Sequence, residues 1–307
     1  MKLIKQFEIV EVGPRDGFQS IKKFIPFKLK MEIILLLINS GIKNIQIGSF
    51  VSPKAIIQMK DSYKIVKNIK SKNFKNLKLG VLVPNLYGAK IARELELEYV
   101  TFVFSVSEKH NLANVKRTIQ ESLLDLKNII KIYKNEEKIT KIKVDLATTF
   151  GCPFEGVQSI SKVLELVKKV VSFGVKNVVF CDTIGVANPL QVEKFWNIFL
   201  KKAPEGINYG VHFHDTRGLG LANILISLQY PIKWVESSFG GFGGCPFAPG
   251  AAGNVATEDL LNMLEAAGVL NIKVNNKLLL EAVEKLLPYN REALNSHFYN
   301  IHKKDLK

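Results

Sequence analysis

Two histidines at the end of a strand-like segment are the residues best placed to do chemistry. His212 and His214 stand two positions apart in the segment 209–216, and glycines follow at 218 and 220. Side chains at i and i+2 of a strand point to the same face, so both imidazoles are predicted to enter one cavity. Paired imidazoles at an open rim indicate a divalent-cation site. The alternative is one core histidine and one loop histidine.

Asp16 and Asn254 are candidates to complete the ligand set, if the fold brings them to the same rim. Two imidazoles, one carboxylate and one amide oxygen, without a thiolate, suit six-coordinate Mg²⁺ or Mn²⁺ with positions open for substrate oxygens. A closed structural zinc site favours cysteine ligands, although zinc is not excluded. Asn254 also has a purely structural interpretation, as an N-cap or turn residue before the helix that starts near Thr257.

Two of the three cysteines lie in similar glycine-containing loops. Cys245 is in the segment 240–250, GGFGGCPFAPG, whose glycines indicate a loop that can close over a ligand. A thiol there could be a proton donor or a nucleophile. Cys152 occupies the related string GCPF at 151–154, so the sequence does not rank the two. Cys181 ends an apolar strand and is predicted to lie in the core.

Three further charged residues are candidates for roles in the site. Arg15 is suited to clamp a carboxylate or a developing enolate oxygen. Asp182 is a candidate base or supporting group, with a hydrogen bond to Thr183 as the structural alternative. Glu258 is a candidate catalytic residue, but the helix dipole alone explains an acidic residue in a first helical turn.

Short β-branched runs alternate with helical stretches along the whole chain. The predicted strands are Glu8–Val12, Asn44–Ile47, Leu77–Val83, Tyr99–Val103, Ile142–Thr148, Asn177–Cys181, Tyr209–His214 and Trp234–Ser237. The predicted helices are Phe27–Ser40, Met59–Lys70, Leu86–Glu94, Asn114–Lys134, Ser159–Phe173, Pro189–Lys202, Gly218–Gln229 and Thr257–Ala267.

Eight strand–helix units indicate an α/β fold, a (β/α)8 TIM barrel with parallel strands. An open doubly wound sheet would carry G-x-G-x-x-G after its first strand, where this chain has GPRDG at 13–17. The barrel is expected to span residues 1–273, and residues 274–307 to form a C-terminal helical extension packed on it. Active sites of such barrels lie beyond the carboxyl ends of the strands, and the candidate residues follow strands 1, 5, 6, 7 and 8.

Composition narrows the class of protein. The 307 residues are 47% hydrophobic and 23% charged, as in soluble globular proteins, and no apolar run is long enough to span a membrane. Three cysteines and the lack of a signal peptide predict the reducing cytoplasm. The net charge of +15 suggests that the protein binds nucleic acid. The lysines are spread through helical stretches, however, which favours a solvated lysine-rich surface. Such a surface would still attract a phosphate-bearing small molecule.

Several strings together resemble the hydroxymethylglutaryl-CoA lyase family, over nearly the whole chain. The strings are EVGPRDGFQ at 11–19, GSFVSPK at 48–54, DTIG at 182–185, HFHDT at 212–216, GFGGCPF at 241–247 and GNVATED at 253–259. The glycine–cysteine loop is the most specific of them. The R-D-G and H-x-H strings alone indicate only the wider superfamily of metal-dependent carbon–carbon lyases and synthases.

The resemblance implies cleavage of 3-hydroxy-3-methylglutaryl-CoA to acetyl-CoA and acetoacetate, as in leucine degradation and ketone-body metabolism. It also implies an acyl-CoA substrate, with no nucleic-acid or membrane partner and a homodimer as a possible assembly. Arg15 would bind the thioester oxygen, Cys245 would protonate the acetyl-CoA carbanion, and Asp182 and Glu258 would support proton transfer. The implied ligands of Mg²⁺ or Mn²⁺ are Asp16, His212, His214 and Asn254.

The chain departs from the family pattern at one position of consequence. Gln46 stands at the end of the second strand, where the family usually has an acidic residue. An amide cannot serve as a base or neutralise Arg15, which puts full activity on the usual substrate in question. Arg217 and Leu219 replace the commoner Tyr and Gln and are expected to alter the acyl pocket.

Three functions therefore compete. The first is a hydroxymethylglutaryl-CoA lyase, or a sister lyase for another 3-hydroxy-3-methylacyl-CoA. The second is a synthase that condenses acetyl-CoA with a 2-oxo acid, and the Gly-Gly-Cys-Pro string argues against it. The third is a non-enzymatic nucleic-acid binder that exploits the charge of +15.

Overall fold

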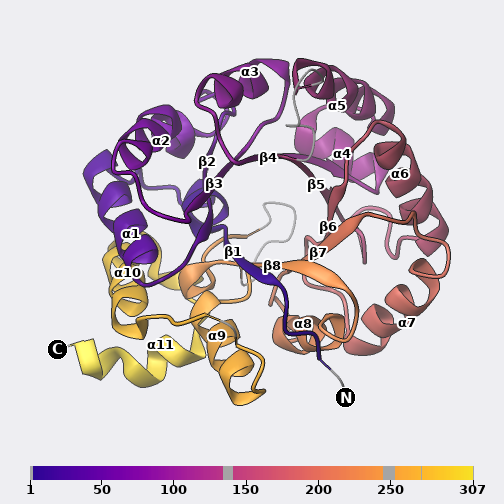
Figure 1. The fold of residues 1–307 in the computed structure, drawn as a ribbon. Helices are drawn as coiled ribbons and strands as arrows, with labels where there is room; N and C mark the ends of the chain where they lie inside the picture. The colour runs from indigo at the N-terminus through magenta and orange to yellow at the C-terminus, as the bar shows by residue number, and fades with distance from the viewer. Residues whose placement is uncertain (1–2, 134–140, 245–252, 271, 307) are drawn as a thin grey trace.

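The computed structural model describes residues 3–133, 141–244, 253–270 and 272–306. Eight parallel strands pair in chain order and close into a barrel, because β1 also pairs with β8 (Figure 1). This confirms the predicted (β/α)8 architecture. The strands are β1 (Glu8–Glu11), β2 (Asn44–Ser49), β3 (Lys78–Leu82), β4 (Tyr99–Ser105), β5 (Ile142–Ala147), β6 (Asn177–Asp182), β7 (Asn208–Phe213) and β8 (Ile232–Ser237).

Helices surround the barrel as an outer ring (Figure 1). They are α1 (Phe27–Asn39), α2 (Ser62–Lys70), α3 (Leu86–Glu94), α4 (Glu108–Val115), α5 (Ile119–Tyr133), α6 (Ile160–Ser172), α7 (Pro189–Phe199), α8 (Gly220–Ser227), α9 (Thr257–Ala266), α10 (Asn276–Asn290) and α11 (His297–His302). Single turns of other helix types occur at η1 (Gly13–Gly17), η2 (Ile57–Asp61), η4 (Phe239–Gly241), η5 (Arg291–Ala293) and η6 (Lys303–Leu306).

The single helix predicted over residues 114–134 is wrong, because two helices cover this region. The side chain of Ser107 accepts a hydrogen bond from the backbone amide of His110 and so starts α4 before the predicted boundary. Lys116 then adopts the left-handed conformation (φ 59°), which ends α4, and α5 starts at Ile119. Hydrophobic periodicity continues across this break, so the pattern alone did not reveal it.

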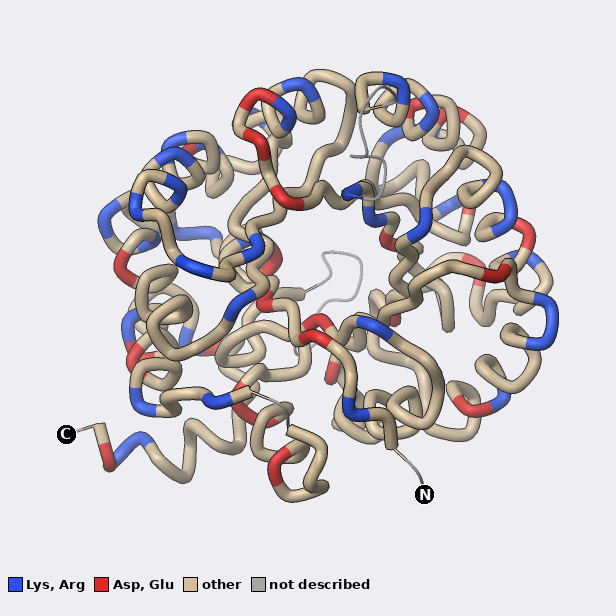
Figure 2. Tube along the Cα trace, viewed as in Figure 1, with Lys and Arg blue, Asp and Glu red and all other residues tan. Residues whose placement is uncertain are grey.

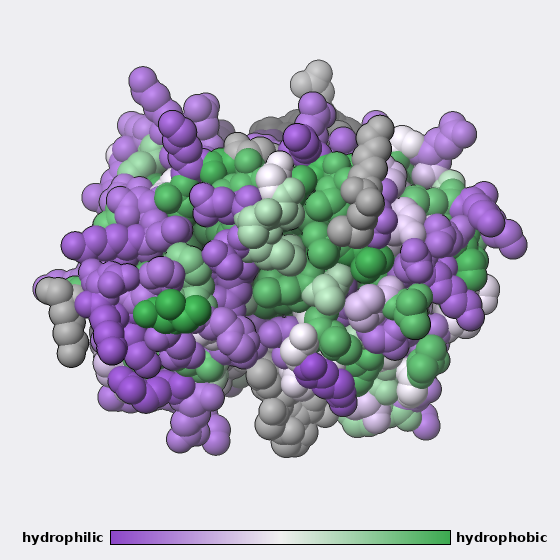
Figure 3. Space-filling model, turned by 90° about the horizontal axis from the view of Figure 1, so that it is seen from below, coloured by the Kyte–Doolittle hydropathy of each residue, from purple (hydrophilic) through white to green (hydrophobic). Residues whose placement is uncertain are grey.

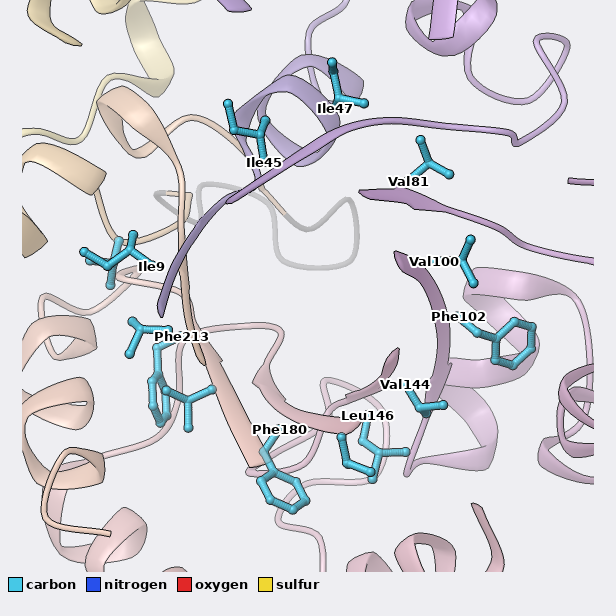
Figure 4. Close-up of a cluster of buried hydrophobic side chains, with 14 of the residues drawn as sticks. Ile9, Ile45, Ile47, Val81, Val100, Phe102, Val144, Leu146, Phe180 and Phe213 are labelled. Carbon is cyan, nitrogen blue, oxygen red and sulfur yellow. The ribbon is translucent and has the colours of Figure 1, made fainter. Parts of the chain in front are cut away.

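The main core lies between the strands and the helices. Side chains that alternate along each strand point out of the barrel toward the helical ring, as Ile45, Val144 and Phe180 do in Figure 4. Phe180 is fully buried and meets four aromatic rings at centroid distances between 4.9 and 5.7 Å, those of Phe195, Trp196, Phe199 and Tyr209. This cluster joins β6 and β7 to α7.

The C-terminal segment packs on the barrel through its longest helix. α10 lies against α1, and the Nζ of Lys285 lies 3.1 Å from a carboxylate oxygen of Glu32. Gly41, at the end of α1, has φ 110°, and a Cβ there would lie 2.4 Å from the carbonyl oxygen of Lys273. Only glycine permits this close approach. The domain boundary between residues 273 and 274 stays a prediction.

The outer surface carries many charged residues, but they do not cover it evenly. Figure 2 shows Lys and Arg around the ring of helices rather than at one place. The face seen in Figure 3 carries hydrophilic side chains over its left part and hydrophobic residues toward its middle and right. In the part of the chain that the structure describes, no helix has the length and apolar character needed to cross a membrane.

Phe180→Ala is expected to lower the free energy of unfolding by about 3–5 kcal/mol, because it removes the ring that four aromatic neighbours enclose. Urea titration followed by circular dichroism measures this change. Leu190→Ala, on the same α7 but at a side chain 77% exposed, is the control and should change stability by less than about 0.5 kcal/mol. Equal losses in the two variants would contradict the assignment of the core.

Candidate active site

A cavity of about 210 Å³ opens beyond the carboxyl ends of the barrel strands. Its wall combines residues from η1, β2 to β7, α4 and the loops at this rim, which agrees with the predicted location of the site. The polar and ionisable residues on this wall are Arg15, Asp16, Gln19, Ser49, His110, Asn114, Asp145, Cys181, Thr183, His212 and His214.

A single π-helical turn places Arg15 and Asp16. The amide of Asp16 donates to the carbonyl of Val12 at 2.7 Å, and the amide of Phe18 donates to the carbonyl of Gly13, five residues earlier. All five residues of the turn are buried. A π turn widens the backbone relative to an α-helix and is frequent at functional sites. Here it directs a guanidinium and a carboxylate into the barrel from directly after β1.

Asp16, His212 and His214 form one compact group, with a ligand atom of each within 4.8 Å of the others. Burial would raise the pKa of Asp16, but the charge of Arg15, the largest of the lowering causes, holds it below its ordinary value. Burial lowers the pKa of His214 to about 3. The group therefore presents an anionic carboxylate and a neutral imidazole, the forms that bind a divalent cation.

Asn254 joins this group by lying beside β7, where it forms a β-bridge with His214. Its amide nitrogen donates to Asp16 at 2.7 Å and to the carbonyl of Phe242 at 2.9 Å. The N-cap of α9 is Ala256, so the interpretation of Asn254 as a helix cap is wrong. Gly243 (φ 135°) packs so closely that a Cβ would lie 2.2 Å from the Asn254 amide nitrogen.

Two buried atoms of this group have no hydrogen-bond partner among the described residues, the Nδ1 of His214 and the Oδ1 of Asn254. Buried polar atoms without a partner are costly, and each one calls for an explanation. Both are atoms that bind divalent cations. The set of Asp16, His212, His214 and Asn254 thus fits a divalent cation with oxygen and imidazole ligands.

Arg15 is held between two side chains. Its Nη1 lies 2.5 Å from Asp16, and its Nε donates to the Oε1 of Gln46. The amide nitrogen of Gln46 donates in turn to the hydroxyl of Thr101 at 2.8 Å, which fixes the orientation of the amide. Gln46 is fully buried. The amide therefore orients Arg15 as an acidic residue could, but without neutralising its charge.

Three buried charged residues inside the barrel were not predicted. Lys143 on β5 pairs with Glu236 on β8 and lies 3.9 Å from Asp145. Burial, and after it the charge of Glu236, raise the pKa of Asp145 to about 7 against the lowering effect of Lys143. The sequence carried a signal: Lys143 and Asp145 alternate with apolar residues in a strand that is buried on both faces.

Asp182 and Glu258 are buried but are not among the described residues that line the cavity. The carboxylate of Asp182 accepts the amides of Val186 and Ala187 at 3.0 and 2.9 Å. The carboxylate of Glu258 accepts the amide of Gly240 at 3.0 Å. Burial raises the pKa of Asp182 to about 6 and that of Glu258 to about 8. Both residues hold the backbone of rim loops in this structure.

The three cysteines differ in their location relative to the cavity. Cys245 lies outside the described residues. Cys152 is buried away from the lining residues, with its thiol 2.9 Å from the hydroxyl of Ser107. Cys181 is buried as expected, but it lines the cavity rather than the outer core, and burial raises the pKa of its thiol well above the ordinary value.

The expectation that Arg217 and Leu219 shape the acyl pocket is not met among the described lining residues. The guanidinium of Arg217 instead donates to the carbonyls of Ile184 and Gly185 at 3.0 and 2.9 Å. Leu219 is the N-cap residue of α8. The Arg217 side chain thus holds the loop after β6, whereas Leu219 precedes α8 without a side-chain capping hydrogen bond.

Comparison with known proteins agrees with this geometry. The HMGL-like family model matches residues 6–286. The mitochondrial hydroxymethylglutaryl-CoA lyase of Arabidopsis thaliana is 40% identical over 265 residues, 86% of this chain and 56% of that protein. The hydroxymethylglutaryl-CoA lyase YngG of Bacillus subtilis is 39% identical over 285 residues, 92% of this chain and 90% of that protein.

A solved structure supports the same assignment. An HMG-CoA lyase from Acinetobacter baumannii, in complex with coenzyme A and 3-methylmalate, superposes with a TM-score of 0.88 at 35% identity. The match covers 98% of this chain and 96% of that one. The chain therefore belongs to the HMGL-like family, that of the hydroxymethylglutaryl-CoA lyases, and is a carbon–carbon lyase.

Proposed function

We propose that this protein cleaves 3-hydroxy-3-methylglutaryl-CoA to acetyl-CoA and acetoacetate. The observation that carries the proposal is the convergence of Arg15, Asp16, His212 and His214 on one cavity at the carboxyl ends of the strands. The names of relatives that match over about nine-tenths of the chain support the choice of substrate. The coenzyme A in the Acinetobacter baumannii structure supports an acyl-CoA ligand here.

A divalent cation, Mg²⁺ or Mn²⁺, is proposed to be held by Asp16, His212, His214 and Asn254. The oxygen-rich ligand set without thiolate favours these metals over a structural zinc. When bound, such a cation supplies Lewis acidity that polarises the hydroxyl and carboxylate oxygens of the substrate.

The reaction breaks the bond between C2 and C3 of the acyl group. The C3 hydroxyl loses its proton and becomes the ketone of acetoacetate, while the electrons of the broken bond leave as the enolate of acetyl-CoA. Arg15 is proposed to bind the thioester oxygen and stabilise the enolate. The thiol of Cys245 is proposed to protonate the enolate carbon. Asp182, the candidate base, is proposed to accept the C3 hydroxyl proton, with Glu258 supporting proton transfer; the contacts of both carboxylates with backbone amides also hold the rim loops.

Four finer expectations stay predictions. They are the cytoplasmic location, a homodimer, a place in leucine degradation or ketone-body metabolism, and the absence of nucleic-acid or membrane partners. The spread of Lys and Arg around the helical ring in Figure 2 supports a solvated surface over a nucleic-acid site.

A sister lyase for another 3-hydroxy-3-methylacyl-CoA is the second candidate. Gln46 favours it, because Arg15 contacts an amide at this position and the site there carries one negative charge fewer than the family pattern. Incubating the protein with Mg²⁺ or Mn²⁺ and a panel of hydroxyacyl-CoA thioesters, and identifying the products by mass, distinguishes the two candidates.

His214→Ala is expected to abolish turnover and Mn²⁺ binding while the fold is kept, because it removes a metal ligand rather than a packing group. Chelation of the parent protein should have the same effect, and Mg²⁺ or Mn²⁺ should restore activity. His297→Ala, at an exposed histidine of α11, is the control and should behave as the parent. Full activity after chelation would sink the metal-dependent mechanism.

Cys245→Ser is expected to lower kcat by about 10²–10⁴-fold if this thiol is the proton donor. Cys152→Ser is the matched control and should be mild, because a hydroxyl can replace the thiol beside Ser107 and the residue lies off the cavity wall. Steady-state kinetics with the thioester measure both. Equal losses in the two variants would show that the acid is misassigned.

Gln46→Glu is expected to raise kcat on 3-hydroxy-3-methylglutaryl-CoA, if the position acts through charge, because the carboxylate would neutralise Arg15. The hydroxyl of Thr101 can turn to donate to the new carboxylate, so the change fits the space. If the site is tuned for another thioester, the same change should lower activity on that one. Thr101→Val, which frees the amide without adding charge, is the control. If Gln46→Glu has the same kcat as the parent on every thioester, this position has no electrostatic role.

A further inference from the structure

The two histidines of the cavity differ in what their Nδ1 atoms contact. The Nδ1 of His214 is buried without a hydrogen-bond partner among the described residues. The Nδ1 of His212 lies 3.0 Å from the Oε2 of Glu236. Glu236 stands opposite His212 in the register of β7 and β8, and its side chain is fully buried. The protein thus fixes the imidazole of His212 through Glu236, whereas no described residue holds the Nδ1 of His214.

The second oxygen of Glu236 contacts the ammonium of Lys143, which reaches across the barrel interior from β5. Both side chains are almost completely buried, at 0% and 6% exposure. A buried carboxylate on its own would be strongly destabilised as an anion. The ammonium of Lys143 compensates that charge and holds the carboxylate in place. Glu236 is therefore an ionised acceptor with one oxygen occupied and the other aimed at His212.

An ionised carboxylate has no proton to donate, so the hydrogen bond must be donated by the Nδ1–H of His212. In the neutral imidazole the lone pair is then on Nε2, which leaves this nitrogen as the one that can bind a cation in the group of Asp16, His212 and His214. We propose that Glu236, anchored by Lys143, is a positioning residue that fixes the tautomer and orientation of His212 for the divalent cation. The inference rests on the proposed metal role of His212.

This arrangement has a physical effect on metal affinity. A histidine that donates its second N–H to a carboxylate is a more basic ligand, and it loses less rotational freedom when the cation binds. Losing such a partner typically weakens metal binding by about 10–100-fold. A merely structural ion pair between Lys143 and Glu236 would hold β5 and β8 together without changing the state of the imidazole.

Glu236→Gln tests the role of the carboxylate. The amide can turn its oxygen to Lys143 or to His212 but not to both, so it no longer specifies the tautomer. Mn²⁺ binding to metal-free protein, measured by calorimetry and by electron paramagnetic resonance, is expected to weaken by about 10–100-fold. Asp61→Asn is the control, because it removes the carboxylate that pairs with another buried lysine, Lys30, in the outer layer. It should leave Mn²⁺ affinity unchanged.

A second measurement needs no variant. Nitrogen-15 NMR of the metal-free parent should show the ring of His212 protonated at Nδ1 alone. An Nε2–H tautomer of His212 in the parent would overturn the positioning role. So would a folded Glu236→Gln variant whose Mn²⁺ affinity lies within twofold of that of the parent. If the parent has the Nδ1–H tautomer but binds no Mn²⁺, the orientation by Glu236 stands and the proposed metal-dependent function fails.

Discussion

Closure of the parallel barrel is the constraint on which the site depends. Pairing of β1 with β8 places the turn after the first strand beside the loops after the last two. Asp16 thereby meets Asn254, which lies 238 positions later, at 2.7 Å. Neither segment could hold a cation alone, because each supplies too few ligands. Closure of the sheet brings residues that are far apart in the sequence together at the carboxyl ends of the strands.

Compensation of buried charge is the second theme of the structure. The barrel interior holds Arg15, Asp16, Lys143, Asp145 and Glu236, and burial would disfavour each charge if it were isolated. Most of these charges are paired: Arg15 contacts Asp16, and Lys143 contacts Glu236. Asp145 is held less closely, because its Oδ1 lies 3.9 Å from the Nζ of Lys143 and accepts no hydrogen bond from a described residue. These buried charges form a network inside the barrel. Removal of one charged side chain would leave its partner buried without a compensating charge.

Much of this could be predicted because local patterns were strong. Alternation of strands and helices identified the barrel, and the spacing of His212 and His214 placed both on one face. Other features were missed. The start of α5 has a local signal, the capping box in which the Thr118 amide donates to the Glu121 carboxylate and the Glu121 amide donates to the Thr118 hydroxyl, but the apolar pattern does not show it. The contacts of Asp182 and Glu258 with backbone amides depend on loop geometry, which a string of residue types does not contain.

The sequence by itself determined the fold class and the residue types available for the cation, because these depend on period and residue identity, and its resemblance to the family marked Gln46 as the replacement of an acid. Tertiary structure alone decided which residues share the cavity, since this depends on register and on the direction of side chains within the closed sheet. It brought Lys143 from β5 to Glu236 on β8, and it turned Cys181 inward and Asp182 away. Neighbouring side chains on a strand point to opposite faces. Cys181 therefore lines the cavity, whereas Asp182, the next residue, contacts the backbone amides of a rim loop.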